Sequence, residues 1–569
     1  MKIETIRHSL SHILATSVQE LYPGVKFGIG PAIENGFYYD FDLKRSLAPS
    51  GLPKIEKKMK ELIKKDIKFK KKIVSRKEAK KIFKKQPYKL ELIDKLPGKE
   101  VTIYETGLFI DLCRGPHVKS TKEINADAFK LTKIAGAYWR GSEKNPMLTR
   151  IYGIAFKTKK EIDEHLKIEE EAEKRDHRKI GQRQELFLLH ETAPGMPYWL
   201  PKGVIVYQEL INFWRREHKK RGYQEVITPL LNKKGLYQTS GHWKHYKEHM
   251  FIAKTEEKET YGVKAMNCPN AMIIYKSKPR SYKELPLRFS DIDPIHRYER
   301  SGTLYGLFRV REFRQDDAHI FITEDQIKEE YKNILEIADY FYSIFNIEYS
   351  FRLGTRPEKF MGDIENWNKA EKKLKEILEE SGKKYVILEG DGAFYGPKID
   401  ILMKDAIGRE WQMGTIQLDF QMPKNFDLSY TDAKGRKKTP VTIHRVIYGA
   451  LERFIGILLE HSNGSLPVWI APLQVWVIPV GSDHRKYAQE VASQLEKEDL
   501  RVKAKIEAET VSKKIRAGEI QKIPYILVVG DKEMEKKSVR VRKRKRGDIG
   551  MVKLEKFINQ IKKEIEEKK

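Results

Sequence analysis

The chain of 569 residues has room for about four domains at roughly 150 residues each, and its 40% apolar content excludes a disordered protein. Its net charge of +29, from 110 Lys and Arg against 81 Asp and Glu, favours a polyanionic partner such as nucleic acid, with a lysine-rich proteome as the alternative. Two cysteines are too few for a disulfide framework. The apolar runs are strand-sized and the first residues lack an apolar signal core, so we expect a cytoplasmic protein without a membrane partner.

The first predicted domain, residues 1–156, mixes helical and strand patterns and is typical of an α+β unit. A helix is expected from Ile6 to Leu21, where a Pro-Gly turn follows. The segment from Lys54 to Lys85 carries sixteen basic and four acidic residues, yet its apolar residues fall at helical spacing. We therefore interpret it first as a solvated helical face and only second as an RNA contact.

A His-His pair and a Cys-His pair in this domain have the same spacing. His8 and His12 stand at i and i+4 on one helical face, and Cys113 and His117 repeat that spacing beside Asp111 and a Gly-Pro turn. Surface histidines would explain the first pair alone. Together the four side chains could either bind zinc or form a polar hydrolytic pocket, and spacing leaves both interpretations open.

Beyond the first domain the composition changes three times. Residues 157–183 are almost continuously charged and predict an exposed connecting helix. Residues 184–467 are rich in strands, aromatics and Gly/Pro turns and form one large predicted domain. Residues 468–569 alternate short strands with helices, which indicates an α/β domain with a mostly parallel sheet, including strands at Arg501–Ala508 and around Arg540.

The segment Ile295–Phe321 predicts an antiparallel hairpin with an unusual polar face. Its loop would lie around Gly302 and Gly306, and Arg297 and Glu299 would be reachable from the first arm. Period-two alternation would place six side chains of the second arm on one face: Arg309, Arg311, Phe313, Gln315, Asp317 and His319. Buried charges need partners, so this face favours a ligand that carries both negative and positive groups.

Three residues of the large domain could form a metal site. Cys268, His319 and His444 are far apart in the sequence, and each alone is more often structural. If they converge, one thiolate and two imidazoles leave a fourth zinc position open for a substrate. The domain has no P-loop or dinucleotide glycine motif, so a nucleotide would be held by side chains such as Arg297 and Arg453. Arg453 should lie on a helix that His444 precedes.

These residues resemble the motifs of the threonyl-tRNA synthetases, a family of class II aminoacyl-tRNA synthetases, over nearly the whole chain. RGYQEVITPLL, with Pro229, resembles the motif 1 that builds the homodimer interface, the hairpin resembles motif 2, and GALERF resembles motif 3. AMNCPNAM, RQDDAH and TIHR resemble the zinc-ligand segments, while GAFYGPKID and WQMGTIQLDF resemble active-site strands. The resemblance implies an editing domain (1–156), a linker helix (157–183), a class II antiparallel-sheet catalytic domain (184–467) and an anticodon-binding domain (468–569).

The resemblance also implies a reaction, namely ATP-dependent attachment of L-threonine to tRNA(Thr) through a threonyl-adenylate. Mg²⁺ would accompany ATP, and one Zn²⁺ per subunit, held by Cys268, His319 and His444, would take the amine and hydroxyl of threonine. Arg297 would hold the α-phosphate and the carboxylate. Glu299 would contact adenine, and Arg309 and Arg453 the outer phosphates. The implied threonine-pocket residues are Gln315, Asp317, Tyr395, Gln412, Met266, Lys398 and Gln417.

Such a site should need an editing activity. Valine would leave polar groups unpaired, whereas serine lacks only a methyl group, worth ~1 to 3 kcal/mol. Hydrolysis of mischarged seryl-tRNA(Thr) is therefore expected, and the resemblance implies that this hydrolysis needs no obligatory metal. The implied editing residues are His8, His12, Tyr39, Lys89, Asp111, Cys113 and His117, and the implied tRNA-binding residues are Arg540, Arg542 and Arg544 on one strand. The small ubiquitin-like domain that precedes the editing domain in bacterial members is expected to be absent.

Two other functions compete with this prediction. A non-catalytic RNA-binding paralogue would be expected to lose Arg297, Arg453 or a zinc ligand, and all are present. A synthetase for proline is disfavoured by the Cys-His-His set, and one for serine by the intact editing motif.

Overall fold

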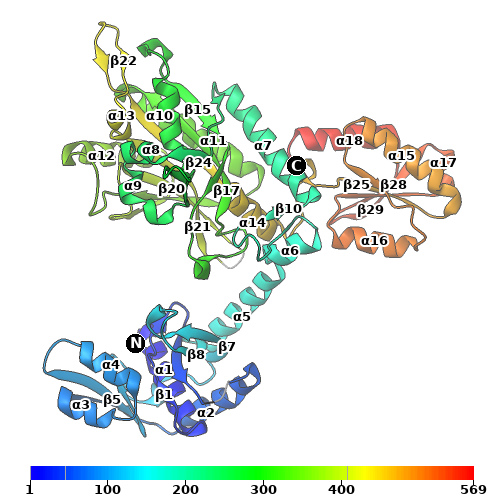
Figure 1. The fold of residues 1–569 in the computed structure, drawn as a ribbon. Helices are drawn as coiled ribbons and strands as arrows, with labels where there is room; N and C mark the ends of the chain where they lie inside the picture. Colours follow the sequence, from blue (N-terminus) through cyan, green and yellow to red (C-terminus); the bar gives the residue numbers. More distant parts are fainter. Residues whose placement is uncertain (1, 45–46, 406–407) are drawn as a thin grey trace. The chain divides into compact units, whose positions relative to one another are not determined.

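The computed structural model describes every residue except 1, 45–46 and 406–407 (Figure 1). The chain forms two compact units, Met1–Glu170 and Glu171–Lys569. In the part of the chain that the structure describes, no helix is long and apolar enough to cross a membrane.

The N-terminal unit packs helix α1 (Ile3–Leu21) on an antiparallel sheet of five strands. Buried Leu10 and Leu14 of α1 belong to the same core as Phe37 and Phe41 of the sheet. The predicted helix at this position is confirmed, including its end at Leu21. The strands are β1 (Lys26–Phe27), β2 (Ala32–Ile33), β3 (Gly36–Asp42), β7 (Phe129–Tyr138) and β8 (Met147–Ala155).

The basic segment of this unit is helical over only part of its length. Helix α2 (Leu52–Lys64) buries Ile55 and Met59, as the helical spacing predicts. The chain then turns into a strand, because β-branched Ile73 and Val74 extend the run that pairs with the next strand. The second, three-stranded sheet and its helices are β4 (Phe69–Ser75), α3 (Arg76–Ile82), α4 (Pro87–Lys95), β5 (Glu100–Thr106) and β6 (Phe109–Leu112).

The predicted single connecting helix is wrong, since two helices occupy this segment: α5 (Lys159–Lys174) and α6 (His177–Arg183). Asp176 leaves the helical conformation between them (φ −53°, ψ 118°) and caps α6 by accepting a hydrogen bond from the Arg178 amide. The expected exposure holds for α5. Helix α6 instead buries His177 and Ile180 in the second unit.

The second unit is built on a nine-stranded sheet, whose main path is antiparallel except for the outermost pair at each end. Strand β16 (Pro294–His296) joins it by pairing with β17. In spatial order the main strands are β11 (Gln224–Glu225), β15 (Leu287–Asp291), β17 (Glu312–Ile322), β24 (Val441–Ala450), β21 (Glu410–Asp419), β20 (Lys398–Lys404), β18 (Tyr349–Gly354) and β19 (Tyr385–Leu388).

Alternation along these strands gives the sheet one apolar and one polar face. Ile320 and Ile443 pack in a large core with helices from elsewhere in the unit. Their neighbours His319 and His444 point to the opposite face and are paired across β17 and β24. The core helices are α7 (Pro201–Lys220), α11 (Ile327–Ile344), α12 (Ile364–Glu380) and α14 (Leu451–Ser462), seen in Figure 1.

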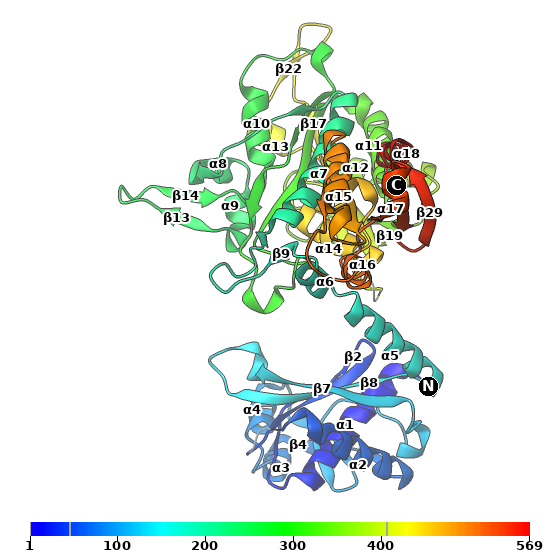
Figure 2. The ribbon, with the colours of Figure 1, turned by 90° about the vertical axis from the view of Figure 1, so that its right-hand side faces the viewer.

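A small three-stranded sheet and short helices complete this part of the unit. The hairpin of β13 (Ile252–Lys254) and β14 (Thr260–Val263) projects from the body of the unit, and β12 (Leu231–Lys233) pairs with β14 (Figure 2). The short helices are α8 (Lys234–Thr239), α9 (His242–His245), α10 (Cys268–Lys276) and α13 (Met422–Asn425), and the short strands are β9 (Phe187–Leu188), β10 (Tyr198–Trp199), β22 (Tyr430–Thr431) and β23 (Lys437–Lys438).

The C-terminal part forms a five-stranded sheet with α15 and α18 on one face and α16 on the other (Figure 1). The prediction of a mostly parallel sheet is wrong, because two strand pairings are parallel and two antiparallel. In spatial order the strands are β26 (Val502–Ala504), β25 (Val475–Pro479), β27 (Tyr525–Val529), β28 (Ser538–Lys543) and β29 (Gly547–Lys553). The helices are α15 (Arg485–Lys497), α16 (Val511–Ile520), α17 (Asp531–Glu535) and α18 (Leu554–Glu566).

Two predicted strands of this part are also shorter than expected. The strand predicted over Arg501–Ala508 covers only β26, since the backbone leaves the sheet after Ala504. Strand β28 ends at Lys543, so Arg544 lies beyond it.

Candidate functional site

A cavity of about 360 Å³ opens on the polar face of the large sheet. The strands β17, β20, β21 and β24 present their alternate side chains to this face. The cavity brings together nine residues that the sequence singled out: Met266, Cys268, Arg297, Gln315, Asp317, Tyr395, Gln412, Gln417 and His444.

Cys268 and His444 line this cavity, and together with His319 they place one ligand atom each within 4.8 Å of one another. Both ring nitrogens of His319 and Nδ1 of His444 are buried and lack a hydrogen-bond partner in the described structure, a costly arrangement unless a ligand takes them. Burial lowers the pKa of His319 well below its ordinary value, which keeps the imidazole neutral, the form that binds metal. One thiol and two imidazoles fit a zinc ion with an open fourth position.

A carboxylate orients one imidazole of this triad. Nε2 of His444 donates to Oδ2 of Asp419 at 2.9 Å, which leaves Nδ1 as the nitrogen that faces the triad. Asp317, at the same cavity, accepts from Nδ2 of Asn267 at 2.8 Å. The sequence reasoning missed Asp419, although it lies two residues after Gln417 and therefore on the same face of β21. Period-two counting from Gln417 could have found it.

Four neighbouring residues hold the side chain of Arg297. Its Nε donates to the Ala265 carbonyl at 3.1 Å and its Nη2 to Oε1 of Gln315 at 3.3 Å. The guanidinium lies 5.2 Å from the ring centroid of Phe313 and 5.9 Å from that of Tyr246. A planar cation held in this way is suited to a phosphate or carboxylate entering the cavity.

Arg453 completes a cationic region next to the cavity. It lies on α14 after strand β24, as predicted, and donates to the carbonyls of Phe308 and Gln412, both at 2.7 Å. Burial, together with the nearby charges of Arg309 and Arg297, lowers the pKa of Arg453 to about 10, while Glu299 acts in the opposite direction. Three arginines against one carboxylate leave an excess positive potential that favours a polyphosphate.

The hairpin differs from its predicted pattern near the loop. Strands β16 and β17 pair antiparallel, but β17 begins only at Glu312, so Arg309 and Arg311 belong to the loop. Arg311 donates from Nε to the Glu299 carbonyl at 2.9 Å, which stabilises the loop. Phe313 packs with Ile295 and Val310 in an apolar cluster. The prediction that all six side chains lie on one strand face is therefore wrong for the loop residues Arg309 and Arg311.

Three further pocket candidates are engaged with other side chains. The hydroxyl of Tyr395 donates to Oε1 of Gln417 at 2.6 Å. Nε2 of Gln412 donates to Oδ1 of the fully buried Asp400 at 2.7 Å. Nζ of Lys398 lies 3.0 Å from Oδ2 of Asp400, and among the described residues Lys398 is not part of the cavity wall.

A second polar cluster lies in the N-terminal unit between α1 and the segment after β6. His8, His12, Cys113 and His117 place one ligand-type atom each within 4.8 Å of the others. Sγ of Cys113 lies 3.3 Å from Nε2 of His8 and 3.3 Å from Nε2 of His117. The two pairs of side chains, one on α1 and one at the turn around Pro116, thus lie together as the sequence suggested.

Asp111 connects this cluster to Tyr39 and Lys89. Its Oδ2 accepts from the Tyr39 hydroxyl at 2.6 Å and lies 3.5 Å from Nε2 of His12, while Nζ of Lys89 forms a short ion pair with Oδ1. Burial raises the pKa of the Cys113 thiol to about 11. Burial also lowers the pKa of His12 well below its ordinary value. At neutral pH the cluster thus offers a neutral thiol and neutral imidazoles, groups that accept or orient a proton of water.

The three C-terminal arginines are not equivalent. Arg540 is exposed on β28 and pairs with Asp548 at 2.7 Å, while Arg542, two residues on, lies 3.6 Å from Glu519. Arg544 instead donates to the carbonyls of Lys522 (2.6 Å) and Leu466 (2.5 Å). Burial lowers its pKa to about 10. The prediction of three alternating arginines on one strand is therefore wrong for Arg544, which links parts of the second unit.

Three segments of the chain match models of known protein families. Residues 250–462 match the tRNA synthetase class II core domain (G, H, P, S and T), and residues 474–564 match an anticodon binding domain. Residues 101–152 match the second additional domain of threonyl and alanyl tRNA synthetases. The large antiparallel sheet and its cavity are thus the core of a class II aminoacyl-tRNA synthetase, as the sequence predicted.

Full-length relatives identify the family within that class. The chain is 52% identical over 571 residues to a threonine–tRNA ligase of Thermotoga neapolitana, covering 100% of this chain and 89% of that protein. It is 51% identical over 569 residues to the threonine–tRNA ligase of Carboxydothermus hydrogenoformans, with the same coverage. The chain belongs to the threonine–tRNA ligases, the threonyl-tRNA synthetase family.

Solved structures agree with this assignment. A crystal structure of the RNA binding domain of threonyl-tRNA synthetase from Cryptosporidium parvum Iowa II is 40% identical, with a TM-score of 0.66 over 68% of this chain and 98% of that chain. A prolyl-tRNA synthetase from Cryptosporidium parvum, 19% identical with a TM-score of 0.54, covers 69% of this chain and 75% of that chain, and shares the fold.

Proposed function

We propose that this chain activates L-threonine with ATP and Mg²⁺ and transfers it to tRNA(Thr), with the cavity on the large sheet as the adenylate site. One observation carries the proposal: a single cavity is lined both by the guanidinium of Arg297 and by Cys268 and His444, which His319 joins in the triad. The guanidinium suits the phosphate of ATP and the carboxylate of threonine, which react with each other. The triad suits the amine and the hydroxyl of threonine. Tight positioning of both groups would supply much of the rate enhancement.

The other residues have distinct proposed roles in this reaction. Arg309 and Arg453 would hold the outer phosphates, and Glu299 the adenine edge. Bound zinc would supply a Lewis-acid contact for the amine and hydroxyl of threonine. The side chain of threonine would be surrounded by Gln315, Asp317, Tyr395, Gln412, Met266, Gln417 and Lys398. Lys398 would act through its ion pair with Asp400. We propose the cytoplasm, the site of bulk translation, as the compartment.

Charging of total tRNA tests the proposed substrate. Purified protein is incubated with ATP, Mg²⁺ and one of threonine, serine or valine, and acid-stable aminoacyl-tRNA is measured. We expect stable product with threonine alone, since serine is transferred and then hydrolysed. Equal charging with valine would contradict the proposed zinc-dependent discrimination.

Editing is expected to depend on Cys113 and His117 of the N-terminal unit. A double Cys113→Ala, His117→Ala variant should deacylate seryl-tRNA(Thr) about a hundredfold more slowly, because it removes the groups proposed to orient the hydrolytic water. Seryl-tRNA should then accumulate in charging assays with serine. His165→Ala, on α5 of the same unit, is the matched control and should edit normally. Undiminished deacylation by the double variant would refute this assignment.

We also propose that the protein acts as a homodimer through the segment that resembles motif 1. Ile227 is 85% exposed and Leu231 54% exposed in the single chain, next to Pro229. An Ile227→Asp substitution should raise the dimer dissociation constant at least about a hundredfold, because a two-fold interface feels the change twice. Sedimentation analysis measures this. Leu108→Asp, at a residue 84% exposed in the other unit, is the control and should leave the mass unchanged.

A further inference from the structure

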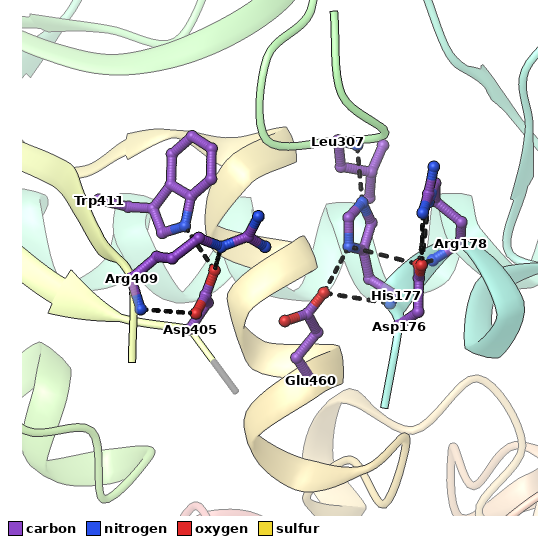
Figure 3. Close-up of polar contacts among 8 residues, drawn as sticks. All are labelled: Asp176, His177, Arg178, Leu307, Asp405, Arg409, Trp411 and Glu460. Atoms are coloured by element: carbon purple, nitrogen blue, oxygen red, sulfur yellow. Dashed lines mark hydrogen bonds and ion pairs between the residues drawn. The ribbon is translucent and has the colours of Figure 1, made fainter. Parts of the chain in front are cut away.

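The first residue of helix α6 lies against the loop that carries Arg309 (Figure 3). The His177 side chain is fully buried, and its Nε2 accepts a hydrogen bond from the Leu307 amide at 3.0 Å. A nitrogen that accepts cannot carry a proton, so the proton is on Nδ1, which donates to Oε1 of Glu460 at 2.8 Å. The imidazole therefore bridges α14 and the tip of the loop.

The loop backbone is pressed onto this ring. Gly306 adopts a positive φ of 49°, and a Cβ built there would lie 2.1 Å from Nε2 of His177. On either side of the tip, the backbones of Tyr305 and Arg309 exchange two hydrogen bonds of 3.1 Å. These two hydrogen bonds fix the shape of the turn from Tyr305 to Arg309. The position of the turn then depends on the residues that contact its tip.

Contacts from the ring continue to the cationic region. The ring centroids of His177 and Phe308 are 4.3 Å apart, and the Phe308 carbonyl accepts the Nε–H of Arg453 at 2.7 Å. Arg453 in turn lies 5.5 Å from the ring centroid of Trp411. Displacement of the turn would therefore move Arg309 directly and Arg453 through the Phe308 carbonyl.

Two guanidiniums also contact the same turn, at Tyr305. The guanidinium of Arg178 lies 4.8 Å from the Tyr305 ring centroid, and that of Arg409 lies 5.2 Å from it. Arg409 and Trp411 both donate to Oδ2 of Asp405, at 2.6 Å and 2.9 Å (Figure 3). His177 differs from these groups because it alone, among the described side chains, hydrogen-bonds the tip amide of the turn.

We propose that His177 is a positioning residue for adenylate formation, which sets the place of Arg309 and Arg453 by holding the Leu307 amide. The inference rests on the phosphate-binding role proposed for those two arginines. Because α6 continues the segment that leads from α5, the same hydrogen bond ties the connecting segment to the ATP loop. The residue does not touch the substrates itself.

Two substitutions separate the two ends of the ring. His177→Asn keeps an amide near the position of Nδ1 and loses the acceptor for Leu307, whereas His177→Gln can reach the position of Nε2 with its oxygen. In threonine-dependent pyrophosphate exchange, which needs no tRNA, we expect His177→Asn to raise KM for ATP about tenfold, as for loss of one buried hydrogen bond. KM for threonine should stay within about twofold by the same reasoning, and His177→Gln should recover most of the ATP affinity.

A double-mutant cycle keeps the test independent of folding. Gly306→Ala alters the loop rather than the core, and its Cβ should raise KM for ATP in the parent chain but much less in the His177→Asn background, where the side chain it meets is smaller. His461→Asn, at the end of α14, serves as the control. Equal effects of His177→Asn and His177→Gln, equal changes in both KM values, or additive effects in the cycle would overturn the proposal. A parent chain without exchange activity would instead refute the proposed function.

Discussion

Replacing Arg297 with alanine is expected to lower kcat/KM for threonine-dependent pyrophosphate exchange by about a thousandfold. The guanidinium is held by the Ala265 carbonyl and by Gln315, so its position is set before substrates bind. Alanine removes the charge that would stabilise the phosphate as the carboxylate attacks it. Exchange of labelled pyrophosphate into ATP measures the step directly and is independent of tRNA.

The variant Arg297→Lys separates charge from shape. Lysine restores a positive charge but not the planar, two-pronged donor, so we expect only partial recovery of activity. Arg436→Ala is the matched control, because Arg436 is exposed and paired with Asp432 on the β22–β23 hairpin. It should leave exchange near the parent value. Full exchange activity in Arg297→Ala would remove this residue from the phosphate site.

Much of the fold could be predicted because local patterns determine it. Helix α1 follows from its apolar spacing and the Pro-Gly turn after Leu21, and β17 follows from the alternation of the predicted hairpin. The break before α6 could not be predicted in this way. It depends on Asp176 acting as a cap and on His177 finding partners on α14 and the loop, contacts with residues more than a hundred positions away.

The candidate sites show the same division between local and distant information. Spacing alone could not bring Cys268, His319 and His444 together, and only the resemblance of their three segments to a known family predicted it. Their carboxylate partner Asp419 belongs to a strand with no metal-ligand signature of its own. Arg544 looked like a third surface arginine by alternation, but it lies beyond the end of β28 and its guanidinium donates to two backbone carbonyls of the same unit.

Replacement of Cys268, a proposed zinc ligand, should abolish threonine activation without abolishing nucleotide binding. Serine at this position is a much weaker ligand than a thiolate, so the Cys268→Ser variant should lose its bound zinc. Since the amine and hydroxyl of threonine would then lack their contact, exchange should fall about a thousandfold or more. Elemental analysis gives the zinc content, and equilibrium binding of an ATP analogue reports the phosphate site separately.

Cys113→Ser is the matched control, because these are the chain's two cysteines and Cys113 lies in the other unit. We expect one zinc per subunit in the parent and in Cys113→Ser, and none in Cys268→Ser. A second zinc that is lost only from Cys113→Ser would mean that the editing cluster also binds metal. Stoichiometric zinc in Cys268→Ser would rule out the triad. Residual activity of that variant should no longer favour threonine over valine, because rejection of valine depends on a site that requires a hydroxyl.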